Sequence, residues 1–158
     1  MIRAMSPARL ASGILLFRRA AAGLEVLLAH PGGPFWARKD EGAWSVPKGE
    51  PGPDEDQLAC ARRELEEETG IVADGPFVDL GEVRQKSGKV VRVWAAEGEG
   101  DPAAMTSNTF TMEWPPRSGR TATFPEVDRC GWFGLDEARR KILPAQAALL
   151  DRLAERVG

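Results

Sequence analysis

The chain has few of the residues from which disulfide scaffolds and zinc centres are built. Its 158 residues include two cysteines, Cys60 and Cys130, and a single histidine, His30. Two thiols this far apart are too few for a disulfide framework or a four-ligand zinc site. We therefore expect both cysteines to be small core residues.

Long hydrophobic runs are also missing. The apolar stretch Leu10 to Phe17 is interrupted by Ser12 and Gly13 and continues directly into Arg18 and Arg19, which is typical of a strand rather than of a signal peptide. No stretch reaches the roughly 20 apolar residues of a membrane span. The sequence therefore predicts no membrane partner and, by default, a cytoplasmic location.

A basic surplus is absent as well. The formal net charge is -3, whereas a protein that binds duplex nucleic acid without sequence preference usually carries excess positive charge. Hydrophobic residues make up 42% and charged residues 28% of the chain, as in ordinary globular proteins. The sequence has no internal repeat, low-complexity tract or linker, so we expect one domain over residues 1–158, with no duplex nucleic acid as partner.

What the sequence does contain is an alternation of strand and helix patterns. Strands are predicted over Leu10–Arg18, Leu24–His30, Ala43–Pro47, Phe77–Lys86, Lys89–Glu97 and Asp128–Phe133, and helices over Asp54–Thr69, over Leu135–Lys141 and from Pro144 onward. The first two strands should form a hairpin. This order predicts an α/β fold, a three-layer α/β/α sandwich with a mixed sheet.

Two segments do not fit this alternation. Residues 30–44 form a long loop with Trp36, Trp44 and the cations Arg38 and Lys39, a composition typical of functional loops. Residues 105–124 begin with a strand-like alternation and continue into a Pro-Pro turn and a basic loop whose structure the pattern does not define.

The helix predicted over Asp54–Thr69 carries three carboxylates on one face. Glu64, Glu67 and Glu68 are three and four residues apart, so their side chains are neighbours on the helix surface and repel one another unless a cation lies among them. A divalent metal is the natural candidate, because Mg²⁺ prefers hard oxygen ligands. A solvated acidic face is the alternative.

The full pattern around this helix resembles the Nudix hydrolases. The chain contains the complete family signature, which consists of Gly49, five residues, Glu55, seven residues, Arg63-Glu64-Leu65, one residue, Glu67-Glu68, one residue, Gly70 and Ile71. The resemblance implies a Nudix fold and hydrolysis of a nucleoside diphosphate linked to another group. It also implies a divalent metal, Mg²⁺ or possibly Mn²⁺.

The resemblance assigns roles to the signature residues. Glu67, Glu68 and the Lys48 carbonyl would bind metal, Glu64 would be either a ligand or the general base, and Arg63 would orient the glutamates. Glu55 would tie the preceding loop to the helix, and Gly49 and Gly70 would be structural. Catalytic function is accordingly expected of Arg63, Glu64 and Glu67.

A further carboxylate is expected from outside the signature. The segment FPEVDRCGWFGLDEA loosely resembles the diadenosine tetraphosphate hydrolase branch, which favours Glu126 as a catalytic residue. Glu113 is the competing choice, and a solvated loop carboxylate is the alternative for each.

Substrate contacts are predicted from residue chemistry. Lys48, Arg84, Lys86 and Lys89 are cations suited to phosphates, while Trp36, Trp44 and Trp114 could stack on a nucleobase or pack in the core. For His30, a phosphate or proton-transfer role stands against a structural one.

We therefore expect a metal-dependent pyrophosphohydrolase acting on a small nucleotide, with dinucleoside polyphosphates or nucleoside triphosphates favoured. The alternative is a noncatalytic nucleotide sensor with the same fold. The sequence leaves open whether the protein is a monomer or a homodimer.

Overall fold

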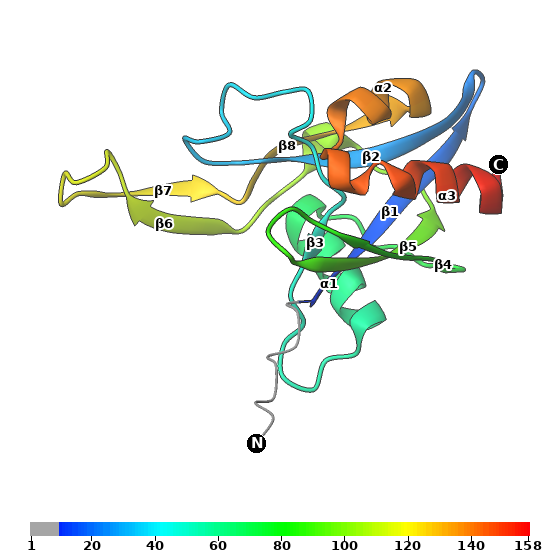
Figure 1. The fold of residues 1–158 in the computed structure, drawn as a ribbon, viewed down its shortest axis with the longest axis horizontal. Coiled ribbons are helices and arrows are strands. Elements are labelled where there is room, and N and C mark those ends of the chain that lie inside the picture. Colours follow the sequence, from blue (N-terminus) through cyan, green and yellow to red (C-terminus); the bar gives the residue numbers. More distant parts are fainter. Residues whose placement is uncertain (1–9) are drawn as a thin grey trace.

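The computed structural model describes residues 10–158, and the statements below concern that part of the chain. The first half contains strands β1 (Leu10–Ala20), β2 (Gly23–Pro31) and β3 (Lys48–Gly49), helix α1 (Gln57–Thr69), and strands β4 (Val78–Arg84) and β5 (Val90–Glu97). The second half contains strands β6 (Thr109–Glu113), β7 (Thr121–Pro125) and β8 (Val127–Gly134) and helices α2 (Leu135–Lys141) and α3 (Ala148–Val157). Short 3₁₀ turns η1 (Pro102–Ala104) and η2 (Pro144–Gln146) complete the order (Figure 1).

The main sheet is mixed, as predicted. Its strands follow the order β4-β5-β1-β2-β8, with β3 pairing to β1 off this path. β1 and β2 form the expected antiparallel hairpin, whereas β1 and β5 are parallel. The central strand β1 thus places its residues next to both β5 and the short strand β3 that leads toward α1.

Helices cover both faces of this sheet, which confirms the α/β/α prediction. Side chains of a strand alternate between faces, and in β1 the buried residues divide accordingly. Ile14 and Leu16 pack in the cluster that includes Ala61 and Leu65 of α1. Leu15 and its neighbours on the other face pack in the cluster that contains α2 and α3.

Helix α1 begins and ends at recognisable caps. The Asp56 carboxylate accepts a hydrogen bond from the Ala59 N–H at 3.2 Å, a typical N-cap that satisfies a free donor of the first turn. Gly70 ends the helix in the left-handed conformation, with φ of 78°, which glycine adopts without steric cost. The helix therefore starts at Gln57, three residues later than predicted from the apolar periodicity.

The strand predicted over Ala43–Pro47 is wrong. Only single bridges join Ser45 to Ala29 and Trp44 to Ile142, and the strand that pairs with β1 is Lys48–Gly49. The side chain of Trp44 is buried, and Pro47 has no N–H to donate to a ladder. Regular pairing is therefore established only after the proline.

The C-terminal helix also begins later than predicted. Pro144 opens the 3₁₀ turn η2, and α3 starts at Ala148 with its leucines buried against the sheet. The buried Gln146 side chain accepts from the Val46 N–H and donates to Ser45 Oγ and Gln85 Oε1, each at 3.0 Å. These bonds fix the turn against the segment that leads to β3.

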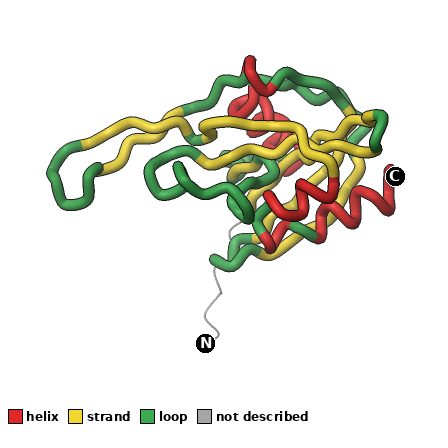
Figure 2. The backbone as a smooth tube through the Cα atoms, turned by 90° about the horizontal axis from the view of Figure 1, so that it is seen from above, coloured by secondary structure: helices red, strands yellow, loops and turns green. Residues whose placement is uncertain are grey.

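Residues 105–124, whose second half the sequence did not define, mostly form a projecting hairpin. Strands β6 and β7 pair only with each other and extend away from the body (Figures 1 and 2). We call residues 109–125 the arm. Phe110 and Phe124 face each other across it at 5.9 Å between ring centroids, and Phe110 packs near Gly33 of the long loop.

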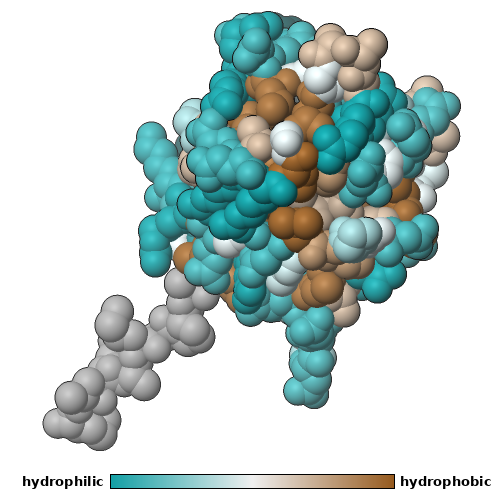
Figure 3. Space-filling model, turned by 90° about the vertical axis from the view of Figure 1, so that its right-hand side faces the viewer, coloured by the Kyte–Doolittle hydropathy of each residue, from teal (hydrophilic) through white to brown (hydrophobic). Residues whose placement is uncertain are grey.

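The end of the molecule away from the arm is largely hydrophilic, with apolar residues reaching the surface in patches (Figure 3). Both cysteines are buried and free, as expected. Among residues 10–158 no helix is long and apolar enough to cross a membrane.

Candidate active site

Arg63 is the centre of the charged network on α1. Its guanidinium forms a bidentate pair with Glu55, with both N–O distances at 2.8 Å. Its Nη1 donates to Glu64 Oε1 and to Glu67 Oε2, each at 3.0 Å. A planar guanidinium suits such paired contacts. One arginine thus orients three carboxylates from the loop and the helix.

The pairing of Arg63 with Glu55 shifts both pKa values. The Arg63 hydrogen bonds, and then the Gly52 N–H, lower the pKa of Glu55 to about 2, and the same bonds raise the pKa of Arg63. Both groups therefore stay charged throughout the neutral range. Because Glu55 lies in the loop before α1, this ion pair ties that loop to the helix.

Gly49 lies directly against Glu64. A Cβ at residue 49 would overlap the Glu64 carboxyl group, so glycine is required there for close approach. The Gly49 carbonyl also accepts from Cys60 Sγ at 3.3 Å. The glycine of the signature is therefore part of the wall that holds Glu64 in place.

Glu68 points inward from α1 and is only 9% exposed. Its Oε2 accepts a hydrogen bond from the Lys48 N–H at 3.1 Å. Burial, followed by the neighbouring Glu64 carboxylate, raises the pKa of Glu68 to about 9. Without a cation, Glu68 therefore keeps its proton at neutral pH.

The three predicted carboxylates do not converge as one group. Within the described residues, no set of three acidic, histidine or cysteine side chains is arranged to hold a metal ion. Arg63 Nη1 bonds to both Glu64 and Glu67, while Glu68 is turned inward toward the Lys48 N–H. Glu64 and Glu68 form the close pair, and their hard oxygen donors with the high pKa of Glu68 match the needs of a divalent cation.

Ser12 is a buried polar residue that the sequence reasoning missed. It lies opposite Gly49 in the pairing of β1 with β3. Its Oγ is buried and has no hydrogen-bond partner among residues 10–158. Ser12 differs from an ordinary strand serine only because β3 pairs beside it, and no sequence pattern predicts that pairing.

Glu126 lies beside this pair, at the base of the arm. It lines a cavity of about 200 Å³ together with Lys48, Glu68, Ser45 and Pro31. Burial, and then the charges of Glu64 and Glu67, raise the pKa of Glu126. The sequence-predicted distal carboxylate is therefore placed next to the glutamates of α1.

Glu113 occupies a different place. Its two carboxylate oxygens accept hydrogen bonds from the N–H groups of Arg117 and Gly119, at 3.1 and 3.2 Å. The side chain thus closes the turn at the tip of the arm. Of the two candidates for the distal carboxylate, only Glu126 shares a cavity with Glu68 and Lys48.

A second cavity, of about 770 Å³, unites several predicted substrate contacts. Its lining is mostly apolar and comes from three distant segments, which contribute Trp36, residues 84–87 and residues 143–145. Arg84 and Lys86 supply positive charge there. The ammonium group of Lys39 lies 5.1 Å from the centre of the Trp36 ring, a cation–π contact. We call this space the Trp36 cavity.

The remaining predicted contacts are placed differently. Trp44 is 5% exposed, donates its indole N–H to Asp40 at 2.8 Å and packs edge-on against His30 and Phe133. It is a core residue, and its prediction as a substrate contact is not supported because a buried ring has no open face for a base.

Lys48 and Lys89 border the carboxylates. Desolvation, and then the charge of Lys89, lower the pKa of Lys48, against the opposing effect of Glu68 and Glu64. Lys89 Nζ lies 4.0 Å from Glu50 Oε1, beside the signature loop. Two ammonium groups thus lie near the cavity that Glu68 and Glu126 line.

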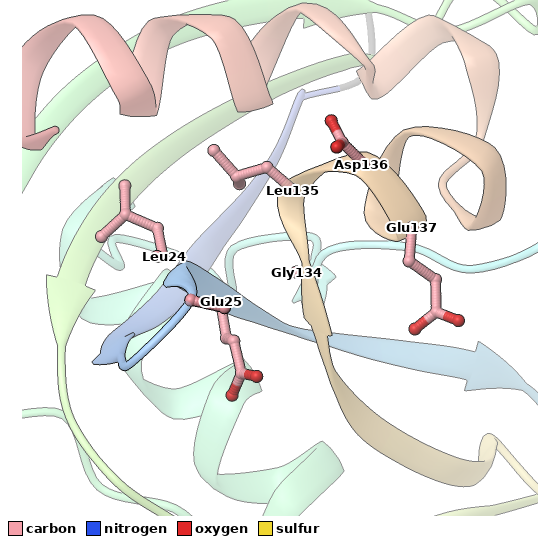
Figure 4. A pocket seen from close by; sticks show the side chains of 8 residues that line it. Leu24, Glu25, Gly134, Leu135, Asp136 and Glu137 are labelled. Carbon is pink, nitrogen blue, oxygen red and sulfur yellow. The ribbon is translucent and has the colours of Figure 1, made fainter.

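A third cavity, of about 360 Å³, contains none of these residues. It is lined by the β1–β2 turn and the start of α2, and its acidic side chains are Glu25, Asp136 and Glu137. Their carboxylates point in different directions (Figure 4). This cavity therefore has no convergent donor set.

The sequence matches the family model of the NUDIX domain over residues 7–153. The chain belongs to the Nudix family. This match covers nearly all of the chain, and it confirms the prediction of a Nudix hydrolase. A comparison with curated proteins found none that matches.

Solved structures share the Nudix fold. An Ap4A hydrolase of C. elegans in a binary complex is similar at a TM-score of 0.65 and 22% identity, over 92% of this chain and 96% of that one. The NUDIX domain of Shewanella oneidensis NrtR, complexed with ADP ribose, is similar at a TM-score of 0.68 and 20% identity, over 98% and 91%. A mutT/nudix family protein from Listeria innocua is similar at 0.63 and 20%, over 97% and 96%.

Proposed function

We propose that this Nudix protein is a metal-dependent pyrophosphohydrolase that cleaves a diphosphate linkage in a small nucleotide by attack of water. One observation carries the proposal. Glu68 lines the cavity that Lys48 and Glu126 also line, and it lies beside Glu64, which Arg63 and Gly49 hold in place. Carboxylates and cations facing one small cavity suit a substrate that carries several negative charges.

The residues that would hold the metal are Glu64, Glu68 and the Lys48 carbonyl, with Glu67 as a further oxygen donor. A bound Mg²⁺ or Mn²⁺ supplies charge neutralisation and a lower pKa for a coordinated water. In this proposal Arg63 is a positioning residue, because its contacts are with the glutamates themselves.

Glu126 is our choice for the group that receives a proton from the attacking water. Burial and the nearby glutamates already raise its pKa, which suits a general base near neutral pH. Glu64 is the competing base. Lys48 and Lys89 would bind the phosphate oxygens of the substrate, since both border the carboxylates.

The Trp36 cavity would receive the nucleobase. An indole next to an apolar wall offers a stacking surface, and Arg84 and Lys86 can contact a phosphate or ribose. Gln146 connects the two cavities, because its side chain bonds both to Ser45, which lines the Glu126 cavity, and to Gln85, which lines the Trp36 cavity. The reaction site and the nucleobase site would thus be joined by the hydrogen bonds of the Gln146 side chain.

Among nucleotides, we favour dinucleoside polyphosphates and nucleoside triphosphates. The resemblance of the C-terminal segment to diadenosine tetraphosphate hydrolases supports the first, and a solved neighbour is an Ap4A hydrolase. ADP-ribose belongs in the same test, because another neighbour is a NUDIX domain complexed with it. A cytoplasmic location remains a prediction.

The test is a substrate panel. Purified protein is incubated with Ap4A, ATP or ADP-ribose and with Mg²⁺, Mn²⁺ or EDTA, and the products are separated by chromatography. We expect turnover of at least one substrate that EDTA abolishes. A noncatalytic sensor would instead bind a nucleotide tightly and turn over none, although the intact carboxylates of α1 argue against that alternative.

A further inference from the structure

His30, the single histidine of the chain, lies fully buried near the end of β2 and is not among the residues that line the three cavities. Its Nδ1 lies 2.8 Å from Asp128 Oδ1 of β8, and its Nε2 lies 2.5 Å from the Lys39 carbonyl oxygen. A carbonyl oxygen and an ionised carboxylate only accept hydrogen bonds. Each ring nitrogen must therefore donate.

We propose that His30 is a doubly protonated positioning residue that holds the turn Trp36–Lys39 at the Trp36 cavity. A neutral imidazole has one donor nitrogen and one acceptor nitrogen, so at one of these two contacts a ring nitrogen and an oxygen would face each other as two acceptors, on a ring that is itself fully buried. The imidazolium satisfies both, and Asp128 balances its charge.

The contact reaches the cavity through the turn. The Lys39 N–H donates to the Trp36 carbonyl at 2.9 Å, so residues 36–39 close on themselves. His30 bonds to the carbonyl of the same Lys39, whose ammonium lies over the Trp36 ring. The position of the indole thus depends on a buried bond made at the other end of the turn.

Other charged groups around His30 are already engaged. Arg129 of β8 lies 5.3 Å from the Trp44 ring, which packs edge-on against the imidazole. Asp40 accepts from the Trp44 indole and from Lys141 of α2. Asp128 is therefore the carboxylate that faces the imidazole directly.

The consequence for binding rests on the proposed function, because it requires the Trp36 cavity to hold a nucleobase. The protonation and the fixed turn do not depend on that function. They are properties of the free protein and can be measured without substrate.

The first measurement is an NMR spectrum of protein labelled with ¹⁵N-histidine. A single histidine gives one pair of ring-nitrogen signals. We expect both at the position of protonated nitrogens at about pH 8, because each ring nitrogen faces an acceptor. One nitrogen at the unprotonated position at that pH would overturn the assignment.

A matched pair of variants isolates Asp128. In Asp128→Asn the amide can donate to Nδ1, so the ring should become neutral and keep its proton on Nε2. Asp136→Asn, at the exposed start of α2, removes an equal charge and should leave both ring nitrogens protonated. If Asp128→Asn also left both protonated at about pH 8, the carboxylate would not be the group that holds the second proton.

The position of the turn is read from amide hydrogen exchange. Loss of one hydrogen bond to a charged group should speed exchange of the Lys39 N–H about tenfold in His30→Phe, while His30→Gln, which keeps one donor, should lie closer to the wild type. Unchanged Lys39 exchange in a folded His30→Phe protein, or exchange in His30→Gln as fast as in His30→Phe, would contradict the positioning role.

Binding of AMP, measured by calorimetry, separates the two proposals. We expect His30→Phe to weaken AMP binding about tenfold. If the turn loosens but wild-type protein does not bind AMP, the nucleobase role of the Trp36 cavity fails and the role of His30 stands.

Discussion

The charged network around Arg63 and the Trp36 cavity of this Nudix protein are built in opposite ways. The network comes from one continuous segment, since Gly49, Glu55, Arg63, Glu64 and Glu68 follow one another through β3, the loop and α1. The Trp36 cavity is assembled from three segments that lie far apart in the sequence. One region is therefore fixed by local spacing, and the other by tertiary packing.

This difference has a functional meaning. A helix holds charged groups at fixed separations, which suits a reaction centre that must keep its geometry. A wall made from a loop, a β-turn and η2 can change by substitution in any of the three without disturbing α1. We expect variants of the first region to affect turnover, and variants of the second to affect substrate affinity.

The largest effect should come from Glu68→Gln. The change keeps the shape of the side chain but removes its charge, so kcat should fall by on the order of 10² or more, the scale for loss of one electrostatic catalytic group. Steady-state kinetics with saturating Mg²⁺ measure it, and circular dichroism controls for folding. Near wild-type turnover would show that Glu68 does not belong to the reaction centre.

A somewhat smaller effect is expected from Arg63→Ala. Glu55, Glu64 and Glu67 would lose their shared cation, and removal of such supporting groups typically costs about 10- to 100-fold in activity or metal affinity. Arg62→Ala, one residue away, is the matched control, since Arg62 lies over Phe77 instead. Equal activity of the two variants would contradict the positioning role of Arg63.

Trp36→Ala should separate the two regions most clearly. Loss of one stacking surface, worth about 1–3 kcal/mol, should raise KM about tenfold or more and leave kcat within about twofold. Trp114→Ala is the control. Trp114 lies on the arm, packs against Phe35 of the long loop and lines none of the three cavities. A fall in kcat with unchanged KM would mean that the cavity takes part in chemistry.

An effect of another kind concerns stability and pH. In metal-free protein Glu68 has a folded-state pKa of about 9 against an ordinary value of 4.5, so the folded state holds a proton that the unfolded chain loses. Stability from this group should therefore fall as pH rises from about 4.5 to about 9. Thermal unfolding followed against pH measures this trend, which Mg²⁺ or Glu68→Gln should reduce. An equal slope in all three samples would exclude Glu68 as its source.

The sequence contained much of the first region and little of the second. The apolar period of α1 and the Gly70 cap predicted that helix, and the spacing of the glutamates placed Glu64 and Glu68 together. The same spacing suggested that all three glutamates converge, but Glu67 bonds to Arg63 while Glu68 is turned inward toward Lys48, and helical periodicity does not distinguish these two directions.

Sequence patterns do not predict contacts between residues that are far apart in the chain. Trp36 and Trp44 look alike in the sequence, yet one lines a cavity and the other lies in the core, because only Trp44 is packed between His30 and Phe133. The sequence indicated the first strand of the arm by an alternation through Phe110, but the second strand follows the Pro-Pro turn and the basic loop, whose structure the pattern does not define. Its pairing depends on the turn that Glu113 closes.

The account depends most on the pair Glu64–Glu68 as the metal centre, and Mn²⁺ binding tests this directly. Free Mn²⁺ is measured by electron paramagnetic resonance during titration of wild-type protein and Glu68→Gln, without substrate. The account predicts saturable binding by the wild type and at least about tenfold weaker binding by the variant. Equal affinity of the two proteins, or no binding by the wild type, would contradict it.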